Sequence, residues 1–342
     1  MNETRAVHHA AGIIKRGGIV AFPTETVYGL GADAFAPLAV ARIFEVKKRP
    51  HFDPLIVHVA GPDDLGRLVT DIPGPAQKLI NRFWPGPLTL VLPKRDEVPD
   101  IVTAGLPTVA VRMPRHAMAQ RLIELSGSPI AAPSANPFGY VSPTTAEHVR
   151  AQLDDQVDLI LDGGPCPVGV ESTILSFSEE RPMLLRPGGV PLEEIESVIG
   201  KVEITPVEKQ TPDASGPWAS GPWASGPRAP GMLPRHYAPR TPIVLAAKDE
   251  IDSYRNRKAG LLAFRDPSKR PAFVHTEILS RKGDFREAAA NLFAAIRRLD
   301  ALDLEVIVAE AVPETGLGRA IMDRLRRASC EDDKFNYDQS GS

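Results

Sequence analysis

Two apolar segments near the N-terminus each lead into small, hydroxyl-bearing or basic residues. The first is FPTETVYGLGADA at 22–34, in which a strand-like run gives way to hydroxyls, a tyrosine and two glycines. The second is EVKKRPHFDPLIVHV at 45–59, in which three consecutive cations and a proline precede a strand of buried type that reaches His58. Two strands that carry such groups constrain the fold to a sheet with polar strand ends, and they favour a site for a nucleotide and a small polar substrate.

Short apolar runs alternate with amphipathic runs through the region before residue 200. The apolar runs, each bounded by Gly, Pro, Asp or Asn, predict strands at 19–22, 55–59, 88–92, 109–112, 130–132, 159–161, 173–177 and 183–186. Three-to-four spacing predicts helices at 37–48, 63–70, 75–83, 116–126, 144–153 and 192–199. We expect Thr144 to cap the fifth of these helices, with Glu147 completing a capping box. Because helices do not follow strands regularly, we predict an α/β domain with a twisted mixed sheet and packed helices.

A low-complexity segment, ASGPWASGPWASGPRAPG at 214–231, interrupts this pattern. Gly, Pro and Ser every few residues prevent a continuous apolar face, so we predict a linker or mobile loop. Beyond it the sequence predicts strands at 243–246, 260–264 and 306–309, and helices at 284–299 and 317–328. We therefore expect a first domain at 1–203, a linker at 204–240, a small parallel, Rossmann-like α/β domain at 241–330 and a polar tail at 331–342.

The composition excludes several classes of protein. The apolar share of 43% is ordinary for a globular chain, and no apolar run approaches the roughly 18 residues of a membrane span. The N-terminus lacks the features of a signal peptide. Two cysteines, Cys166 and Cys330, form no disulfide framework or zinc motif and fit the reducing cytoplasm. The net charge of −3 and the lack of a basic tail argue against nucleic acid as a tightly held partner.

The basic cluster at 47–49 has two interpretations. It ends a predicted helix, where cations interact favourably with the helix dipole, so its role could be purely structural. Alternatively it clamps phosphates, because Arg49 supplies a fixed fork of donors and Lys47 a point charge. The run that contains Thr24 and Thr26 is equally open: either both hydroxyls share one face of a continuing strand, or the strand ends there in a glycine turn.

Further polar side chains lie at predicted strand ends and helix starts. Arg112 ends a strand of small apolar residues, where its guanidinium needs a partner such as a substrate carboxylate. Ser142 precedes a helix, whose free N–H groups could bind an anion. Ser134, Ser172 and Arg186 also follow or precede strands, although turn and capping chemistry would explain the serines as well. The sequence contains no standard phosphate loop, serine-hydrolase elbow or HExxH motif.

Taken in order, these runs resemble one family. GGIVAFPTETVYGLGADA, KKRPHFDPLIVHV, FWPGPLTLVLP, VAVRMP, APSANPFG, VSPTT, ESTIL and LLRPGG are similar to the YrdC-like domain of threonylcarbamoyl-AMP synthases, over about residues 5–200. PGMLPRHYAP at 230–239 and the run GLGRAIMDRLRRAS resemble the linker and C-terminal domain of the long form of that enzyme. The tryptophan-containing repeat at 215–226 is an insertion relative to the usual linker of the family.

The resemblance implies an activity, its substrates and its location. The chain would join L-threonine, bicarbonate and ATP into threonylcarbamoyl-AMP and pyrophosphate, an adenylyl transfer that serves threonylcarbamoyladenosine modification of tRNA. Other proteins would transfer the product to tRNA. Magnesium would accompany ATP without a metal site built by the protein, and the linker would act as a lid over the site. The resemblance also implies a cytoplasmic protein without membrane or stable nucleic-acid binding.

The resemblance assigns roles to particular residues. Contacts to threonine would come from Thr26, His58, Arg112, Ala132 and Ser172. Contacts to the nucleotide would come from Arg49, Asp53, Thr108, Ser134, Ser142, Arg186 and, in the linker, His236 or Tyr237. Lys47 and Arg49 would be the catalytic residues.

Two other functions remain to be weighed. A non-enzymatic RNA-binding module would use the cations at 47–49, against the slightly negative net charge. A carbamoyl transferase on the same kind of domain would carry additional modules with cysteine-rich metal motifs, which this sequence lacks.

Overall fold

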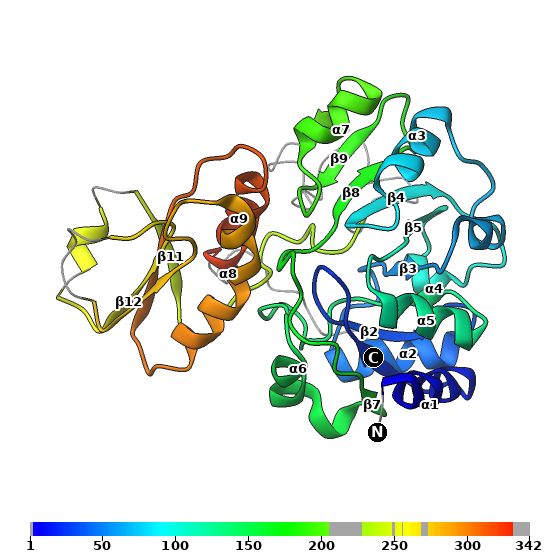
Figure 1. Cartoon of the computed structure of the whole chain (residues 1–342), viewed down its shortest axis with the longest axis horizontal. Helices are drawn as coiled ribbons and strands as arrows, with labels where there is room; N and C mark the ends of the chain where they lie inside the picture. Colours follow the sequence, from blue (N-terminus) through cyan, green and yellow to red (C-terminus); the bar gives the residue numbers. More distant parts are fainter. Residues whose placement is uncertain (1–2, 205–227, 248–249, 255, 268–272, 331–342) are drawn as a thin grey trace.

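The computed structural model describes residues 3–204, 228–247, 250–254, 256–267 and 273–330. In this portion of the chain, a ten-stranded mixed sheet and a four-stranded parallel sheet form two parts that lie side by side (Figure 1). The predicted tail at 331–342 and most of the low-complexity repeat lie outside the described residues.

The larger part holds the N-terminal elements. Its helices are α1 (Glu3–Lys15), α2 (Pro37–Lys47), α3 (Gly74–Phe83), α4 (Asp100–Thr103), α5 (Ala117–Ser126), α6 (Ala146–Leu153) and α7 (Leu192–Ile199), with 3₁₀ turns η1 (Pro62–Arg67) and η2 (Asp154–Gln156). Its strands are β1 (Val20–Phe22), β2 (Gly29–Asp33), β3 (Ile56–His58), β4 (Leu88–Pro93), β5 (Thr108–Arg112), β6 (Ile130–Ala131), β7 (Leu159–Ile160), β8 (Thr173–Ser176), β9 (Met183–Arg186) and β10 (Glu203–Ile204). They pair in the order β10-β9-β8-β4-β5-β3-β6-β2-β1-β7.

The pairing of β3 with β5 places two predicted site residues next to each other. These strands run parallel, and His58 is the register partner of Arg112. On the other side of β3, strand β6 pairs antiparallel, with Ile130 opposite His58. Strand order therefore brings together polar strand ends that are far apart in the sequence.

Alternate residues of the sheet are buried by different layers. Ala21 and Val57 face a core that α2 and α3 cover, through residues such as Phe44 and Ile80. On the opposite face, α1 and α5 cover Val20, Phe22 and Ile130. Further along that face, the chain itself covers the sheet: Ala229 and Met232 pack on Ile56, Val91, Ala110, Ile174 and Leu185. The segment at 228–241 is therefore part of the apolar core as well as a connection.

Neither interpretation of the run that contains Thr24 and Thr26 holds fully, because β1 ends at Phe22 and the glycines lie in the next strand, β2. The run Gly29–Asp33 is a strand and not a glycine turn. A Cβ at Gly31 would lie 2.6 Å from Ile130 Cγ2 and 2.7 Å from Phe22 Cε1. The glycine is needed because neighbouring side chains pack directly against its backbone.

Other differences concern helix ends and short elements. Helix α6 begins at Ala146, and Thr145, not Thr144, is its N-cap, with its hydroxyl accepting from the His148 N–H. The predicted helix at 63–70 is instead the 3₁₀ turn η1. Elements α1, α4, β2, β10 and β13 were not predicted, and several of them are too short to give a periodic signal.

The smaller part confirms the prediction of a parallel α/β arrangement. Its elements are β11 (Ile243–Ala246), η4 (Ile251–Tyr254), β12 (Ala259–Ala263), β13 (His275–Ile278), α8 (Phe285–Asp300), β14 (Val306–Glu310) and α9 (Gly318–Ala328), and the parallel strands pair in the order β11-β14-β12-β13. Helices α8 and α9 lie between this sheet and the larger part (Figure 1).

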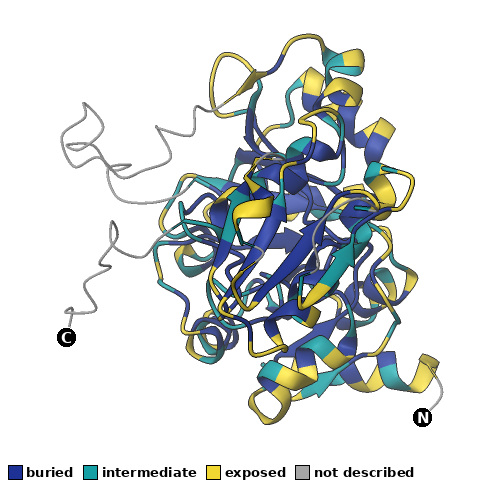
Figure 2. Ribbon diagram, turned by 90° about the vertical axis from the view of Figure 1, so that its left-hand side faces the viewer, coloured by how far each residue is buried: buried dark blue, intermediate teal, exposed yellow. Residues whose placement is uncertain are grey.

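Apolar packing continues from one part to the other. Val27, Val141 and Val170 of the larger part belong to the same cluster as the inner faces of α8 and α9. Figure 2 shows buried strands through the centre of the molecule and exposed residues along the outer helices. This shared cluster fixes the place of the smaller part against the larger one.

Gly169 tests this contact between the parts. Its φ is +74°, and a Cβ there would lie 2.4 Å from the Ala289 carbonyl oxygen on α8. We expect Gly169→Ala to lower the free energy of unfolding by about 3 kcal/mol or more, through overpacking added to backbone strain. Gly127→Ala is the control: its φ is +71° and no atom lies within 4 Å, so about 1 to 2 kcal/mol is expected. Equal losses in urea titrations would contradict tight packing at Gly169.

Candidate active site

A small, partly enclosed pocket of about 50 Å³ lies where several strand ends meet the segment at 228–241. Most of the predicted site residues line it: Thr26, Arg49, His58, Arg112, Ala132, Ser134, Ser172, Arg186, His236 and Tyr237. Residues to which the sequence assigned no substrate contact complete the wall: Thr24, Val27, Gly29, Ile56, Pro133, Glu171, Pro230 and Gly231. The structure thus brings together side chains from seven strand ends or turns and from the segment that covers them.

One corner of the pocket holds an arginine fixed by two neighbours. Arg112 donates from Nη1 to Thr26 Oγ1 at 2.9 Å and from Nη2 to Glu25 Oε2 at 2.6 Å, and all three residues are buried. The Thr24 and Thr26 hydroxyls lie 2.8 Å apart, as a shared face would require, although β1 has already ended at Phe22. Arg112 Nε has no partner among the described residues, so it is a donor that a ligand can use.

His58 lies beside Arg112 as an uncharged imidazole. Burial, together with the positive charge of Arg112, lowers the pKa of His58 to about 3. Its ring packs edge-on against Phe22, with centroids 5.9 Å apart. At neutral pH this histidine therefore offers hydrogen bonding without adding charge.

A second arginine ties the wall of the pocket to its cover. Arg186 donates from Nε and Nη2 to the Ser172 carbonyl and from Nη1 to the Pro230 carbonyl at 2.9 Å. The Ser172 hydroxyl lies 2.7 Å from Thr89 Oγ1 and 3.2 Å from Arg186 Nη2. Arg186 therefore fixes the position of Ser172 and that of the covering segment.

The third arginine of the pocket, Arg49, is held by the turn that follows α2. It donates to the carbonyls of Asp53 and Pro54, and its Nη2 lies 2.8 Å from Asp53 Oδ2. Burial raises the pKa of Asp53 to about 6, although Arg49 and Lys47 act in the opposite direction. Asp53 does not line the pocket; it acts on the pocket through Arg49.

Lys47 also lies outside the pocket lining. Its Nζ donates to the Ser134 carbonyl at 2.6 Å and to the Asn136 carbonyl. Burial, followed by the charge of Arg49, lowers the pKa of Lys47 well below its ordinary value. Lys47 thus orients the turn that presents Ser134 to the pocket.

Two further predicted residues do not reach the pocket. Thr108 begins β5 and pairs with Pro93, at the opposite end of the strand from Arg112. Ser142 is buried, and its hydroxyl donates to Glu171 Oε1 at 2.5 Å. Ser142 therefore supports the wall residue Glu171 from behind.

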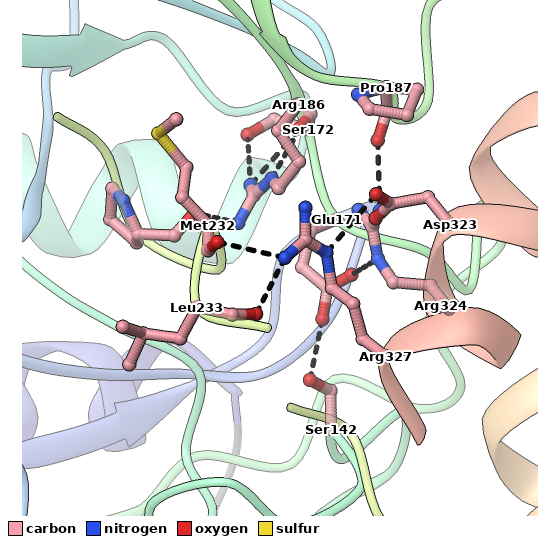
Figure 3. A network of polar contacts seen from close by, with 11 residues as sticks. Ser142, Glu171, Ser172, Arg186, Pro187, Met232, Leu233, Asp323, Arg324 and Arg327 are labelled. Atoms are coloured by element: carbon pink, nitrogen blue, oxygen red, sulfur yellow. Dashed lines mark hydrogen bonds and ion pairs between the residues drawn. The ribbon is translucent and has the colours of Figure 1, made fainter. Parts of the chain in front are cut away.

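Glu171 is the centre of a polar network that sequence reasoning missed (Figure 3). Arg324 of α9 donates from Nε to Glu171 Oε2 at 2.7 Å and from Nη1 to the Pro187 carbonyl. Arg327, one turn later, donates to the carbonyls of Met232 and Leu233. A buried glutamate requires a cationic partner, so Glu171 could have been noted from the sequence. The partner, Arg324, lies 153 residues further along the chain and could not be predicted.

His236 and Tyr237 close the pocket from the covering segment. Both are buried, and their rings lie 4.1 Å apart. Arg324 lies over the Tyr237 ring at 5.0 Å, while Phe293 of α8 stacks on it at 5.7 Å. The Tyr237 hydroxyl has no partner within the described ranges, which leaves it available to a ligand.

The fold and the site define a class of protein. Arginines, hydroxyls and a neutral histidine surround a pocket closed by a segment of the same chain, an arrangement suited to an anionic or zwitterionic substrate. No nucleophile with an adjacent base appears among the residues that line the pocket. The structure is that of an α/β enzyme which positions substrates and neutralises charge.

Comparison with known proteins identifies the family. A family model described as "Telomere recombination" matches residues 12–188, and one described as "Threonylcarbamoyl-AMP synthase, C-terminal domain" matches residues 190–330. The threonylcarbamoyl-AMP synthase of Pyrococcus abyssi is 47% identical over 94% of this chain and 93% of its own, and that of Bacillus subtilis is 43% identical over 94% and 92%. The crystal structure of Pyrococcus abyssi Sua5 complexed with L-threonine has a TM-score of 0.86 and 45% identity, covering 96% of this chain and 95% of that one. The chain belongs to the threonylcarbamoyl-AMP synthase family.

This result confirms the main predictions made from the sequence. The resemblance, the fold class and the enzyme class, a nucleotidyltransferase of tRNA modification that uses threonine, all agree with the family. The RNA-binding module and the carbamoyl transferase gain no support. The domain limits stay a prediction; the family models meet near residue 189, while β10 beyond that point still belongs to the larger sheet.

The state of His58 predicts a pH dependence of stability. Its pKa is about 3 when folded and near 6.5 when exposed, so between these values the unfolded chain binds more protons and acid destabilises the fold. From about pH 7 to pH 4.5 this effect amounts to about 2 to 3 kcal/mol. We expect His58→Gln to lose less unfolding free energy over this range than the parent chain, by about that amount. Parallel pH curves for the two proteins, from urea titrations, would show that His58 is not buried in neutral form.

Proposed function

We propose that this chain forms threonylcarbamoyl-AMP and pyrophosphate from L-threonine, bicarbonate and ATP. The observation that carries the proposal is the joining of two arginine-centred groups in one closed pocket. One consists of Thr26, His58 and Arg112, and the other of Arg49 and Arg186. The first suits the amino acid and the second suits phosphates.

The amino-acid end would use the free donors of the first group. Arg112 Nε would donate to the threonine carboxylate, and the Ser172 hydroxyl lies on the same wall. Neutral His58 could hydrogen-bond a substrate hydroxyl without disturbing the charge balance. Ala132 leaves room at this end because its side chain is small.

The nucleotide end would use Arg49 and Arg186 with Ser134 and the residues of the cover. Each guanidinium is held by backbone carbonyls and can approach phosphate oxygens without reorganising. His236 and Tyr237 would contact the nucleotide from the covering segment. Four predicted residues do not line the pocket and would act on it from outside: Thr108, Ser142, Asp53 and Lys47.

Magnesium would arrive with ATP as part of the substrate. Within the described ranges, no three His, Cys, Asp or Glu side chains are placed to hold a metal ion. Glu171 lines the pocket, but its oxygens already bind Ser142 and Arg324, and Asp53 is paired with Arg49. These residues suit an ion carried on phosphate oxygens and not an ion held by the protein.

The reaction would need positioning more than a protein nucleophile. Bicarbonate adds to the threonine amine with loss of water and forms a carbamate. An oxygen of this new carbamate then attacks the α-phosphorus of ATP. The bond from the α-phosphorus to the bridging oxygen breaks, and pyrophosphate leaves. Fixed guanidinium groups would neutralise the charge on the phosphates, and the closed pocket would exclude water from the mixed anhydride.

The space inside the pocket is about 50 Å³, so we expect its cover to move during turnover. Sites for ligands of drug size enclose about 300 to 1,000 Å³, so ATP and threonine together exceed the enclosed space. Arg186 and Arg327 hold the covering segment through carbonyls of Pro230, Met232 and Leu233. Release of these hydrogen bonds would open the pocket, which makes the segment at 228–241 the lid of the enzyme.

The product would pass to proteins that transfer its threonylcarbamoyl group to tRNA. The net charge of −3 favours no stable nucleic-acid complex of the chain itself. None of the helices in the described part of the chain is long and apolar enough to cross a membrane. We also propose a cytoplasmic location, because a sequence with two cysteines has no disulfide framework.

Two arginine variants test the assignment of the two ends. With ATP, threonine and bicarbonate, we expect pyrophosphate release by the parent chain that requires all three. Arg112→Ala should mainly raise the KM for threonine, and Arg49→Ala mainly the KM for ATP, each by about tenfold or more, since each removes charged hydrogen bonds. Steady-state kinetics with each substrate varied in turn make the measurement.

The matched control is Arg95→Ala. Arg95 is a solvent-exposed arginine that pairs only with exposed Glu97 among the described residues, so its loss should change neither KM. If Arg112→Ala raised only the KM for ATP, or Arg49→Ala only the KM for threonine, the amino-acid and nucleotide ends of the pocket would be assigned the wrong way round. Absence of pyrophosphate release in the parent chain would refute the proposed function.

Gly231→Ala tests the lid. A Cβ at Gly231 would lie 2.4 Å from the Tyr237 hydroxyl and 3.0 Å from Arg186 Nη1, and φ is +76°. The substitution should hold the cover away from the pocket and admit water, so that more ATP is consumed for each threonylcarbamoyl-AMP formed. The ratio of AMP to threonylcarbamoyl-AMP, followed by chromatography, should rise severalfold. Gly105→Ala, with a φ of +74° and open space around it, should leave the ratio unchanged.

A further inference from the structure

A second and larger cavity, of about 420 Å³, lies between the two parts of the molecule. Arg82, Arg115 and Glu194 of the larger part line it, together with Arg286 and Leu317 of the smaller part. Its volume is within the usual range for small-molecule sites. Neither the sequence motifs nor the proposed reaction accounts for it.

An ion pair links the lining of this cavity to the lining of the substrate pocket. Glu25 lines the larger cavity and not the pocket, whereas Arg112 lines the pocket and not the cavity. The Glu25 carboxylate and the Arg112 guanidinium meet at 2.6 Å. The two spaces are therefore back to back, and they share one pair of charges.

Glu25 has an oxygen to spare on this wall. It is only 3% exposed, its Oε2 binds Arg112, and its Oε1 has no partner in the part of the chain that the structure describes. A buried carboxylate oxygen without a donor is costly, so a ligand with an N–H donor would be stabilised there.

The other charged groups of the lining have the opposite sign. No hydrogen bond or ion pair of the Arg82 or Arg286 guanidinium occurs with the described residues, and Arg115 donates only to the Pro85 carbonyl. Phe83, Val168 and Leu317 add an apolar surface. A carboxylate is the natural partner of such arginines.

We propose that this cavity binds a free α-amino acid. The carboxylate of the ligand would pair with the arginines, its ammonium group with Glu25 Oε1, and its side chain would lie on the apolar surface. A phosphate dianion would meet Glu25 and Glu194, and a simple cation would meet three arginines, so the mixed lining favours a zwitterion over either.

The shared ion pair predicts how the two spaces communicate. An ammonium group at Glu25 competes with Arg112 for the carboxylate, and it leaves the Arg112 guanidinium freer for a substrate carboxylate. Occupation of the cavity should therefore tighten threonine binding in the pocket, and by linkage threonine should tighten the occupant. The occupant is either threonine itself or another amino acid, and binding measurements distinguish these sources.

The experiment is equilibrium dialysis of the full chain with labelled L-threonine, and then with each other labelled L-amino acid in the presence of saturating threonine. The test variant is Arg82→Ala/Arg286→Ala, which removes only exposed side chains. The control is Arg95→Ala/Arg181→Ala, which removes two exposed arginines that do not line the cavity. Thermal unfolding confirms that each variant is folded.

We expect the parent and the control to bind one amino acid beyond the threonine of the pocket, and the test variant to bind it about tenfold more weakly or not at all. If each chain binds two equivalents of threonine, threonine is the occupant of the cavity. If it binds one equivalent of threonine and one of another amino acid, that second amino acid is the occupant and acts as a regulator. A single Arg112-dependent equivalent in the parent, with no second amino acid bound at about 10 mM, overturns the proposal.

The result is independent of the proposed function. If the pocket does not take threonine, Arg112→Ala will remove no bound amino acid, while binding that depends on Arg82 and Arg286 persists. If instead the pocket binds threonine and the cavity binds no amino acid, binding will depend on Arg112 and will be the same in the Arg82→Ala/Arg286→Ala variant as in the parent.

Discussion

The buried carboxylate of Glu171 is the interaction on which both the pocket and the arrangement of the two parts depend. It accepts hydrogen bonds from Ser142 and from Arg324, which is fully buried on α9. Loss of one partner would leave an unpaired buried charge, at a cost of about 3 to 5 kcal/mol. Ser172 follows Glu171 directly in the chain, so the place of a hydroxyl that lines the pocket depends on a side chain from the smaller part. The smaller part is thereby a structural component of the active site.

The same helix controls the cover of the pocket. Arg324 lies over the Tyr237 ring, and Arg327 binds two carbonyls of the covering segment. Ala229 and Met232 replace a helix as the layer over one face of the main sheet. Opening the pocket therefore exposes apolar surface and breaks charged hydrogen bonds at once, which favours the closed state until a substrate supplies compensating contacts.

The sequence predicted most strands because each is a short apolar run, and it predicted the cations and hydroxyls at their ends. It could not predict strand order, so the register that pairs His58 with Arg112 appeared only in the structure. Glu25 and Glu171 were missed for a related reason: each is paired with an arginine that lies 87 or 153 residues away. The sequence left Lys47 between a structural role and a phosphate clamp, and in the structure its ammonium group binds carbonyls of the 134–136 turn. The sequence therefore showed which side chains are charged, but the partner of each charged side chain depends on the packing of the folded chain.

The charges of the pocket are placed before any substrate arrives. Arg49 rests on carbonyls of its own turn, Arg186 on Ser172 and Pro230, and Arg112 on Glu25 and Thr26. Guanidinium groups held in this way need little reorganisation when negative charge moves from one phosphate oxygen to another, and this is the main source of electrostatic catalysis. The proposed reaction requires no protein base, because its nucleophile would be a carboxylate made from the substrates. A neutral His58 and a Lys47 turned to backbone carbonyls are therefore consistent with an enzyme that works by fixed charge and exclusion of water.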